Sequence, residues 1–238
     1  MNEHEGFTSS QKTTFVEIPP DYLGNITRGS NIGGDERMTL YFSANRFVRK
    51  YFWLRLKLIK ELIELLDVSR EVCLDFGGGG GVFLPTLSRL FKSVVSIDLD
   101  TFEAEKIARD FNLGNARVVQ GNILTMSLST APFDAIIAAD VLEHFRSLEE
   151  PMARIREWLK PHGFLFTSLP TESMLYVALR KVMGKTKPED HYHTAYSVER
   201  TLVDQGFVRI AQRCSPLRMN VLPLFLVSAW KKGGKAAP

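Results

Sequence analysis

The chain has 238 residues, of which 45% are hydrophobic and 24% are charged. This composition is that of an ordinary globular protein, and it excludes a mainly disordered, collagen-like or disulfide-stapled chain. Lys and Arg number 30 against 27 Asp and Glu, so the net charge of +3 is too small to require nucleic acid as a partner. The two cysteines, Cys73 and Cys214, fit the reduced thiols of a cytoplasmic protein.

The N-terminal residues are polar and aperiodic. Residues 1–40 contain the breakers Pro19-Pro20 and Gly33-Gly34, so we expect a flexible N-terminal arm or lid there. The N-terminus lacks a basic start followed by an apolar core, and the apolar stretch at 221–230 is shorter than the roughly 20 residues of a membrane span. We therefore expect neither a secretory signal nor an anchor.

Apolar residues recur at helical spacing over residues 43–67, which predicts one long helix. The first half of this helix carries a block of basic residues without an acidic one. Its members are Arg46, Arg49, Lys50, Arg55, Lys57 and Lys60.

After Ser69, runs of branched and aromatic residues alternate with amphipathic helical runs. This alternation implies right-handed crossovers and a parallel sheet covered on both faces, which is a doubly wound α/β fold. Strands are predicted at 72–76, 94–98, 117–120, 135–139 and 164–168, and helices at 82–91, 102–111 and 148–159. Beyond these elements, helices are predicted at 173–183 and at 198–205 after an N-cap Ser197, and strands at 207–212 and 221–230.

The sharpest motif is a five-glycine loop, 77–81, which follows an apolar strand containing Asp75. Ligands bind beyond the carboxyl ends of such strands, and glycines let the backbone approach them closely. A dinucleotide fingerprint would need a glycine at Val82, and a phosphate loop would need a Lys-Ser or Lys-Thr pair there, so both patterns fail. The Asp75 carboxylate would repel pyrophosphate but favours a ligand that carries ammonium and sulfonium charge.

The segment Asp75-Phe76-Gly77-Gly78-Gly79-Gly80-Gly81 resembles the D-x-G-x-G-x-G motif of class I S-adenosylmethionine-dependent methyltransferases. The similarity continues in chain order over about 70–210, which makes the set more specific than any single motif. Its further members are VVSID at 94–98, QGNI at 120–123, FDAIIAADVLEHF at 133–145 and LKPHGFLF at 159–166.

This resemblance implies a mostly parallel seven-stranded sheet of order 3-2-1-4-5-7-6, with strand 7 antiparallel, and S-adenosylmethionine as the cofactor, with S-adenosylhomocysteine as the product. It implies that Asp98 binds the ribose hydroxyls, with Asp100 as the fallback. Asn122 stands where the family usually has an acid that meets the adenine amino group. The other cofactor-binding residues that it implies are Asp75, Gly77, Gly79, Gly81, Leu99, Ile123 and Ala139.

The resemblance also divides the chain. We expect a single methyltransferase domain over 41–238, in which the helix at 43–67 precedes a cofactor-binding core at 70–170. Residues 171–196 are expected to cover the acceptor site.

Methyl transfer is an in-line displacement in which the cofactor already carries the activated group, so a dedicated base is helpful rather than obligatory. The catalytic candidates are His144, His191 and His193, because imidazole can accept a proton from an acceptor near neutral pH. Asp190 beside two of these histidines could suggest a metal site. No cysteine or carboxylate cluster supports one, and we expect no metal.

We expect a small-molecule or lipid-linked acceptor. The turn at 140–143 lacks the Asn/Asp-Pro-Pro-aromatic pattern of enzymes that methylate base nitrogens, which disfavours nucleic acid. The basic helix and the run at 174–181 leave two alternatives open, a peripheral contact with an anionic membrane or simple core packing. A nicotinamide-dependent oxidoreductase and a non-catalytic nucleotide-sensing or scaffold protein stay open as rival functions, and the sequence gives neither the accepting atom nor the oligomeric state.

Overall fold

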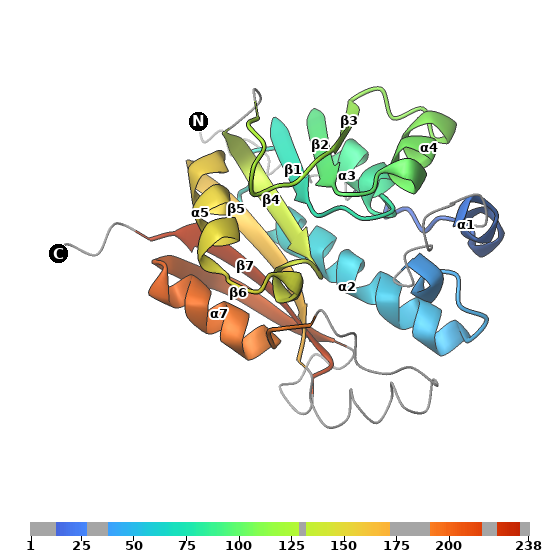
Figure 1. Ribbon diagram of the computed structural model, residues 1–238. Helices are drawn as coiled ribbons and strands as arrows, with labels where there is room; N and C mark the ends of the chain where they lie inside the picture. The colour runs from blue at the N-terminus through green and yellow to red at the C-terminus, as the bar shows by residue number, and fades with distance from the viewer. Residues whose placement is uncertain (1–12, 28–37, 129–131, 172–190, 216–222, 234–238) are drawn as a thin grey trace, which may run out of the picture.

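The computed structural model describes residues 13–27, 38–128, 132–171, 191–215 and 223–233. Within these ranges, seven strands form one sheet in the order β3-β2-β1-β4-β5-β7-β6 (Figure 1). Strand β7 runs antiparallel to both of its neighbours, and the other pairs are parallel. The predicted doubly wound sheet, its strand order and its antiparallel seventh strand are therefore confirmed.

Each strand overlaps its predicted range, and β1 matches its prediction at both ends, whereas β5 begins five residues before the predicted 164 and ends two residues after the predicted 168. The last strand begins at Phe225 rather than at 221: Pro223 and Leu224 precede it, and 221–222 lie outside the described residues. The strands are β1 Val72–Phe76, β2 Ser93–Asp98, β3 Ala116–Gln120, β4 Phe133–Ala139, β5 Leu159–Pro170, β6 Phe207–Ser215 and β7 Phe225–Lys232.

The helices cover the sheet on both faces and include two short 3-10 turns. They are α1 Pro20–Thr27, η1 Met38–Leu40, α2 Arg46–Leu65, α3 Leu84–Leu90, α4 Phe102–Asp110, η2 Leu142–His144, α5 Glu149–Trp158 and α7 Ala195–Asp204. The helix predicted at 173–183 lies outside the described residues.

Helix α7 begins earlier than predicted. Its N-cap is Thr194, whose hydroxyl accepts the Ser197 N–H at 3.3 Å, while the Ser197 hydroxyl accepts the Thr194 N–H at 2.9 Å. This reciprocal pair satisfies two backbone donors at the helix start. Ser197 is therefore the third helical residue rather than the predicted N-cap.

Two apolar clusters lie on opposite faces of the sheet. Helices α1 to α4 contribute to one cluster, and α5 and α7 contribute to the other. The side chains of β1 alternate between them, because successive residues of a strand point to opposite faces. Cys73 belongs to the first cluster, whereas Leu74 and Phe76 belong to the second. The site-bearing Asp75 thus points to the same face as Cys73.

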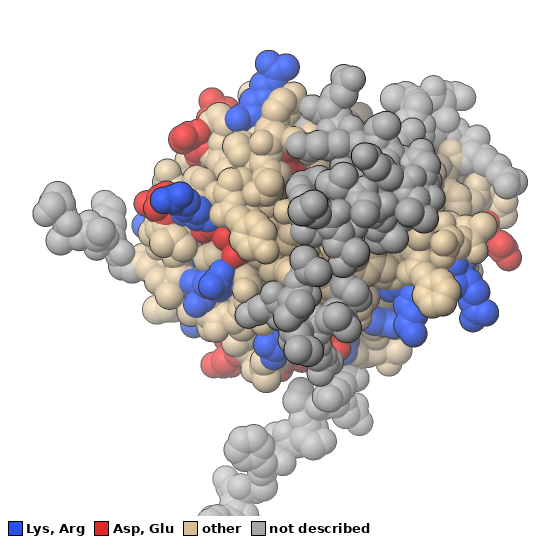
Figure 2. All heavy atoms as spheres, turned by 90° about the horizontal axis from the view of Figure 1, so that it is seen from below, with Lys and Arg blue, Asp and Glu red and all other residues tan. Residues whose placement is uncertain are grey.

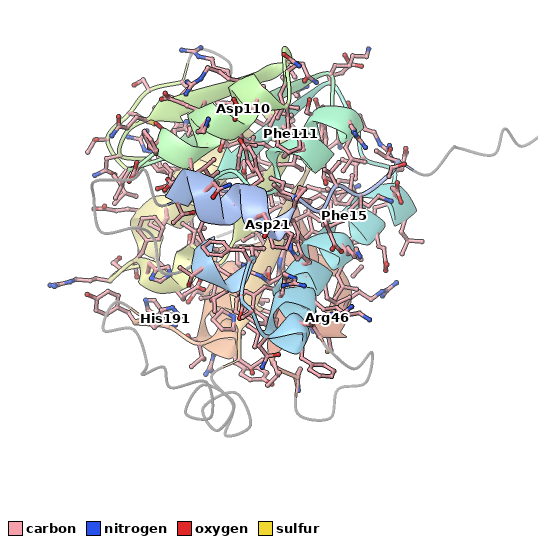
Figure 3. All side chains as sticks on the ribbon, turned by 90° about the vertical axis from the view of Figure 1, so that its right-hand side faces the viewer. Phe15, Asp21, Arg46, Asp110, Phe111 and His191 are labelled. Carbon is pink, nitrogen blue, oxygen red and sulfur yellow. The ribbon has the colours of Figure 1, made fainter. Side chains whose placement is uncertain are left out.

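The described part of the N-terminal segment, 13–27, differs from the flexible arm expected there. Ile18, Leu23 and Ile26 are buried in the first apolar cluster. Tyr22 donates a hydrogen bond of 2.8 Å to Asp110 of α4. Figure 3 shows α1 lying between α4 and α2. The pattern escapes prediction because only three apolar residues around one short helix are buried, and the surface that buries them comes from distant parts of the chain.

We expect Leu23→Ala to lower the free energy of unfolding by about 2–5 kcal/mol, because it leaves a cavity in the apolar cluster. Urea denaturation would measure the change. Tyr22→Phe is the matched control: it removes only the exposed hydrogen bond to Asp110, which water can replace, so it should change the free energy of unfolding much less than Leu23→Ala does. A Leu23→Ala protein as stable as the wild type would mean that α1 does not stay on the core.

No helix among the described residues is long and apolar enough to cross a membrane. On the face shown in Figure 2, the acidic and basic side chains that are coloured form small scattered groups, and several acidic groups lie beside basic ones. This distribution agrees with the small net charge of the chain.

Candidate functional site

The glycine loop connects β1 to α3 and is tied to the end of β2. The N–H groups of Gly77 and Gly78 donate to the Ile97 carbonyl at 2.9 and 3.2 Å. Gly77, Gly79 and Gly81 have φ angles of +72°, +52° and +75°, a region that residues with a side chain rarely adopt. At three of the five positions in the loop, glycine is therefore favoured because of the backbone conformation.

The other two glycines lie close to neighbouring side chains. A Cβ at Gly78 would lie 2.2 Å from the Ser96 Oγ and 2.5 Å from the Asp75 Oδ2. A Cβ at Gly80 would lie 1.8 Å from the sulfur of Met38, so η1 rests on the loop. The loop is thus a tight backbone cradle at the carboxyl ends of β1 and β2.

Asp75 lies buried beneath this loop, and its carboxylate accepts a hydrogen bond from the Ser96 hydroxyl at 3.4 Å. Burial, together with the negative charge of Asp98, raises the pKa of Asp75 to about 7, although the Ser96 hydrogen bond opposes the shift. Two carboxyl groups close together in a partly dry place attract a cationic ligand.

We expect the affinity for S-adenosylmethionine to rise as the pH rises to about 7, by up to about tenfold per unit, and then to level off. The reason is that the cationic ligand favours the ionised form of Asp75, so its binding releases a proton. Calorimetry in buffers of different ionisation enthalpy would measure this release. Asp75→Asn should flatten the profile, whereas pH-independent binding of the wild type between pH 5 and pH 7 would contradict the expectation.

The unliganded protein should show the opposite trend in stability. Between about pH 4 and 7 the folded chain keeps the proton on Asp75 while the unfolded chain has lost it. Raising the pH through this window therefore lowers the free energy of unfolding. Asp75→Asn should remove that decline.

Asp98 ends β2, as predicted, beside the glycine loop. Its carboxylate accepts the Gly79 N–H at 2.8 Å and the Asp100 N–H at 3.3 Å. A carboxylate has about four acceptor positions, so two ribose hydroxyls can still be bound. The next residue, Leu99, exposes 69% of its surface, which makes it available to an adenine ring. The fallback Asp100 instead caps the turn by accepting the Phe102 N–H at 3.1 Å.

Asn122 follows β3 and is exposed. Its side-chain oxygen accepts the Leu124 N–H at 2.9 Å, so it stabilises its own turn and retains one lone pair for a ligand. The adjacent Ile123 is buried in the second apolar cluster. The structure therefore brings Asn122 to the same edge as Asp98, where β2 and β3 are neighbours.

Ala139 ends β4, and the residue after it, Asp140, has a φ of +53°. Asp140 is held by three interactions: its N–H donates to the Ser168 carbonyl at 2.9 Å, its carboxylate accepts the Ser168 hydroxyl at 3.4 Å, and it forms an ion pair with Arg55. A strained backbone persists only where its surroundings hold it in place.

Arg55 comes from α2 and was predicted only as part of a basic block. It is buried, with its guanidinium 5.5, 5.0 and 5.3 Å from the ring centres of Tyr41, Phe52 and Phe225. A signal for this was present in the sequence, because Arg55 falls on the apolar stripe, three residues after Phe52. The structure thus adds an Arg55–Asp140 pair to the candidate site.

The predicted histidines gather beside the turn after β4. The rings of His144 and His191 are 4.6 Å apart in an edge-to-face arrangement. His193 is partly buried, and its Nε2 has no hydrogen-bond partner among the described residues. Asp190 lies outside the described residues. Glu143, for which the sequence predicts no role, lies beside His144 and His191.

The glycine loop and the histidine-bearing turn are in contact. A Cβ at Gly77 would lie 2.3 Å from the Cγ2 of Val141, the residue that precedes η2. The two halves of the candidate site therefore share one edge of the sheet, with the acidic loop on one side and the histidines on the other.

Comparison with known proteins places the chain in a family. A family model described as a methyltransferase domain matches residues 47–211. The ubiquinone biosynthesis O-methyltransferase of Xanthomonas oryzae pv. oryzae (strain PXO99A) is 31% identical over 139 residues, which cover 54% of this chain and 56% of that protein. The mitochondrial ubiquinone biosynthesis O-methyltransferase of Rattus norvegicus is 34% identical over 119 residues, covering 47% of this chain and 34% of that one. The chain thus spans about half the length, or less, of these curated relatives.

Solved structures share the fold. An S-adenosylmethionine-dependent methyltransferase from Clostridium acetobutylicum ATCC 824 aligns with a TM-score of 0.65 at 16% identity, covering 84% of this chain and 98% of that one. The magnesium protoporphyrin IX methyltransferase of Synechocystis PCC 6803, with bound S-adenosylhomocysteine, aligns with a TM-score of 0.63 at 16% identity, covering 88% and 99%.

The chain belongs to the class I S-adenosylmethionine-dependent methyltransferase family. The predicted family, the predicted fold and S-adenosylmethionine as the cofactor are confirmed. Neither the nicotinamide oxidoreductase nor the scaffold alternative gains support. The residues at the site fit this cofactor, because its ammonium and sulfonium charges complement Asp75 and Asp98 beneath a backbone cradle free of side chains.

Proposed function

We propose that the chain transfers the methyl group of S-adenosylmethionine to an oxygen of a small-molecule acceptor by in-line displacement. The observation that carries the proposal is the acidic cradle, in which Asp75 and Asp98 lie at the ends of adjacent strands beneath glycines of positive φ. Oxygen as the accepting atom is supported by the names of two relatives, both ubiquinone biosynthesis O-methyltransferases.

On this proposal, Asp98 binds the ribose hydroxyls and Leu99 lies against the adenine. The exposed Asn122 offers its remaining lone pair to the adenine amino group, and Ile123 and Ala139 line the pocket. Asp75 offsets the positive charge of the methionine part, and Gly77, Gly79 and Gly81 let the backbone approach it. The bound cofactor supplies a methyl carbon that is already activated by its sulfonium, so positioning of the acceptor provides most of the rate.

We place the acceptor beside His144 and His191, because the turn that carries His144 contacts the glycine loop through Val141. A histidine within hydrogen-bond reach of the acceptor hydroxyl can take its proton as the oxygen attacks. His193, two residues further on, remains a third candidate for this role.

The division into a lid and a core remains a proposal. Met38 rests on Gly80 of the loop, and residues 191–194 contact η2, so both segments border the site. We propose that the end of the N-terminal segment 1–40, of which 38–40 border the loop, and the segment at 171–196, of which 171 and 191–196 are described, cover the acceptor site of a single domain over 41–238. A cover of this kind would exclude water from the reacting atoms.

The test is to incubate the purified protein with methyl-labelled S-adenosylmethionine and a panel of phenols, catechols, amines and lipid-linked quinone precursors. Labelled methyl ether in a phenol or catechol is the expected product. Label found only in amines would overturn the assignment to oxygen. Transfer restricted to lipid-linked members in vesicles would support the membrane alternative.

A further inference from the structure

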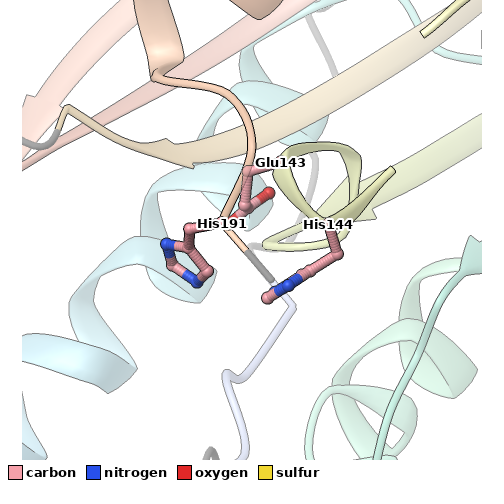
Figure 4. A group of neighbouring side chains, drawn as sticks. All are labelled: Glu143, His144 and His191. Carbon is pink, nitrogen blue, oxygen red and sulfur yellow. The ribbon is translucent and has the colours of Figure 1, made fainter. Parts of the chain in front are cut away.

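Three potential metal ligands meet at the turn after β4. Glu143 and His144 are adjacent in η2, and His191 comes from the segment before α7. Figure 4 shows the three side chains facing one another across a small space. One potential ligand atom from each residue lies within 4.8 Å of the others.

The backbone and a neighbouring pair of side chains fix this arrangement. The Tyr192 N–H donates to the Glu143 carbonyl at 2.9 Å, which joins the segment before α7 to η2. The Arg146 Nε donates to the Tyr192 hydroxyl at 3.3 Å, and its guanidinium lies 5.6 Å from the ring centre. The capped start of α7 at Thr194 follows directly. The ligand atoms are thus held by structured elements on both sides.

The donor set has a defined chemical preference. Two imidazole nitrogens and one carboxylate suit Zn²⁺, which accepts nitrogen and oxygen donors at about 2.0–2.2 Å. Mg²⁺ and Ca²⁺ instead prefer all-oxygen sites. Bonds of that length place tetrahedral donors about 3.4 Å apart. Shifts of the three ligand atoms on the order of 1 Å, reached by side-chain rotation, would bring them to this spacing around an ion.

We propose that Glu143, His144 and His191 bind a divalent cation of the zinc type. Three protein ligands leave a fourth tetrahedral position open, as in catalytic rather than structural zinc sites. The proposal revises the expectation of no metal, which weighed Asp190 with the histidines but did not include Glu143. That carboxylate is buried, with 1% of the residue exposed, where pairing with a cation stabilises it.

The role of the site rests on the proposed function. An acceptor hydroxyl bound at the open position has a lower pKa, so its proton passes to solvent at neutral pH. The oxygen then forms a bond to the methyl carbon while the carbon–sulfur bond breaks, which leaves the neutral thioether of S-adenosylhomocysteine. In this arrangement His144 and His191 hold the cation rather than act as the base.

The test begins with protein freed of metal by chelator dialysis, titrated with Zn²⁺ against a chromophoric chelator. We expect one equivalent to bind, and bound Co²⁺ to give the intense visible bands of a tetrahedral site. Glu143→Gln and His191→Ala should each weaken Zn²⁺ binding more than about 100-fold, because loss of a ligand exceeds the effect of a supporting residue. His162→Ala, at an exposed histidine of β5, is the matched control and should bind as the wild type does.

Zn²⁺ affinity unchanged in the two variants, preferential binding of Mg²⁺, or no binding to the folded protein would overturn the site. His191 is only partly buried, so His191→Ala serves if Glu143→Gln does not fold. Titration of the metal-free protein with S-adenosylhomocysteine separates the two proposals. Cofactor binding without Zn²⁺ binding would refute the metal site alone, and Zn²⁺ binding without cofactor binding would refute the proposed function alone.

Discussion

Asp98→Ala is expected to weaken the binding of S-adenosylhomocysteine by roughly 30-fold to nearly a thousandfold, or about 2–4 kcal/mol. Two ribose hydroxyls lose a charged acceptor in a partly dry crevice. The variant also releases the Gly79 N–H, which the carboxylate binds at 2.8 Å, so the glycine loop loses a tie to β2. Calorimetric titration measures the change directly.

Two further variants make this experiment specific. Asp98→Asn keeps one acceptor oxygen without the charge and should fall between the wild type and Asp98→Ala. Asp100→Ala is the neighbouring control and should bind nearly as the wild type does, because its side chain caps the turn before α4. If folded Asp98→Ala bound S-adenosylhomocysteine with unchanged affinity and Asp100→Ala bound it weakly, Asp100 rather than Asp98 would bind the ribose hydroxyls.

Arg55→Met is expected to lower the free energy of unfolding by about 3–5 kcal/mol. The substitution leaves the Asp140 carboxylate, 16% exposed in its side chain, without its cationic partner. It keeps most of the apolar stem that packs among the rings of Tyr41, Phe52 and Phe225. The decrease in the free energy of unfolding should therefore come from the unpaired charge of Asp140 rather than from a cavity.

The double variant Arg55→Met, Asp140→Asn tests that explanation. Removing both charges should recover most of the lost stability, since the larger penalty comes from leaving one charge alone. Urea unfolding of the wild type, both single variants and the double variant gives the coupling energy. Strictly additive effects would show that the pair contributes nothing as a pair.

The strands were predictable from sequence because their signals are local, whereas their order and the antiparallel seventh strand followed from the family resemblance. The apolar run of β1 is bounded by Val72 and Phe76 in both the prediction and the structure, and the alternation of short strands with amphipathic helices allows few topologies. Helix α1 was not predicted, because it has only eight residues and its apolar side chains are buried against other elements, among them α4 and η1. The start of α7 was predicted three residues too late. Thr194 and Ser197 are both good N-cap residues, and only the structure shows that Thr194 is the N-cap.

In the candidate site, too, some features follow from the local sequence and others depend on how distant segments pack. The glycine loop and Asp98 end neighbouring strands, so their position at one edge of the sheet follows from the chain order. The Arg55–Asp140 pair joins α2 to the turn after β4, and Glu143 meets His191, which lies far along the chain. Such pairings depend on how the helices pack, and no local pattern in the sequence specifies them.

The most direct test of the central claim is a calorimetric titration of the purified protein with S-adenosylhomocysteine and, in parallel, with NADH. The proposed function predicts one equivalent of S-adenosylhomocysteine bound, an affinity that falls in Asp98→Ala, and no binding of NADH. Tight binding of NADH without binding of S-adenosylhomocysteine would contradict it.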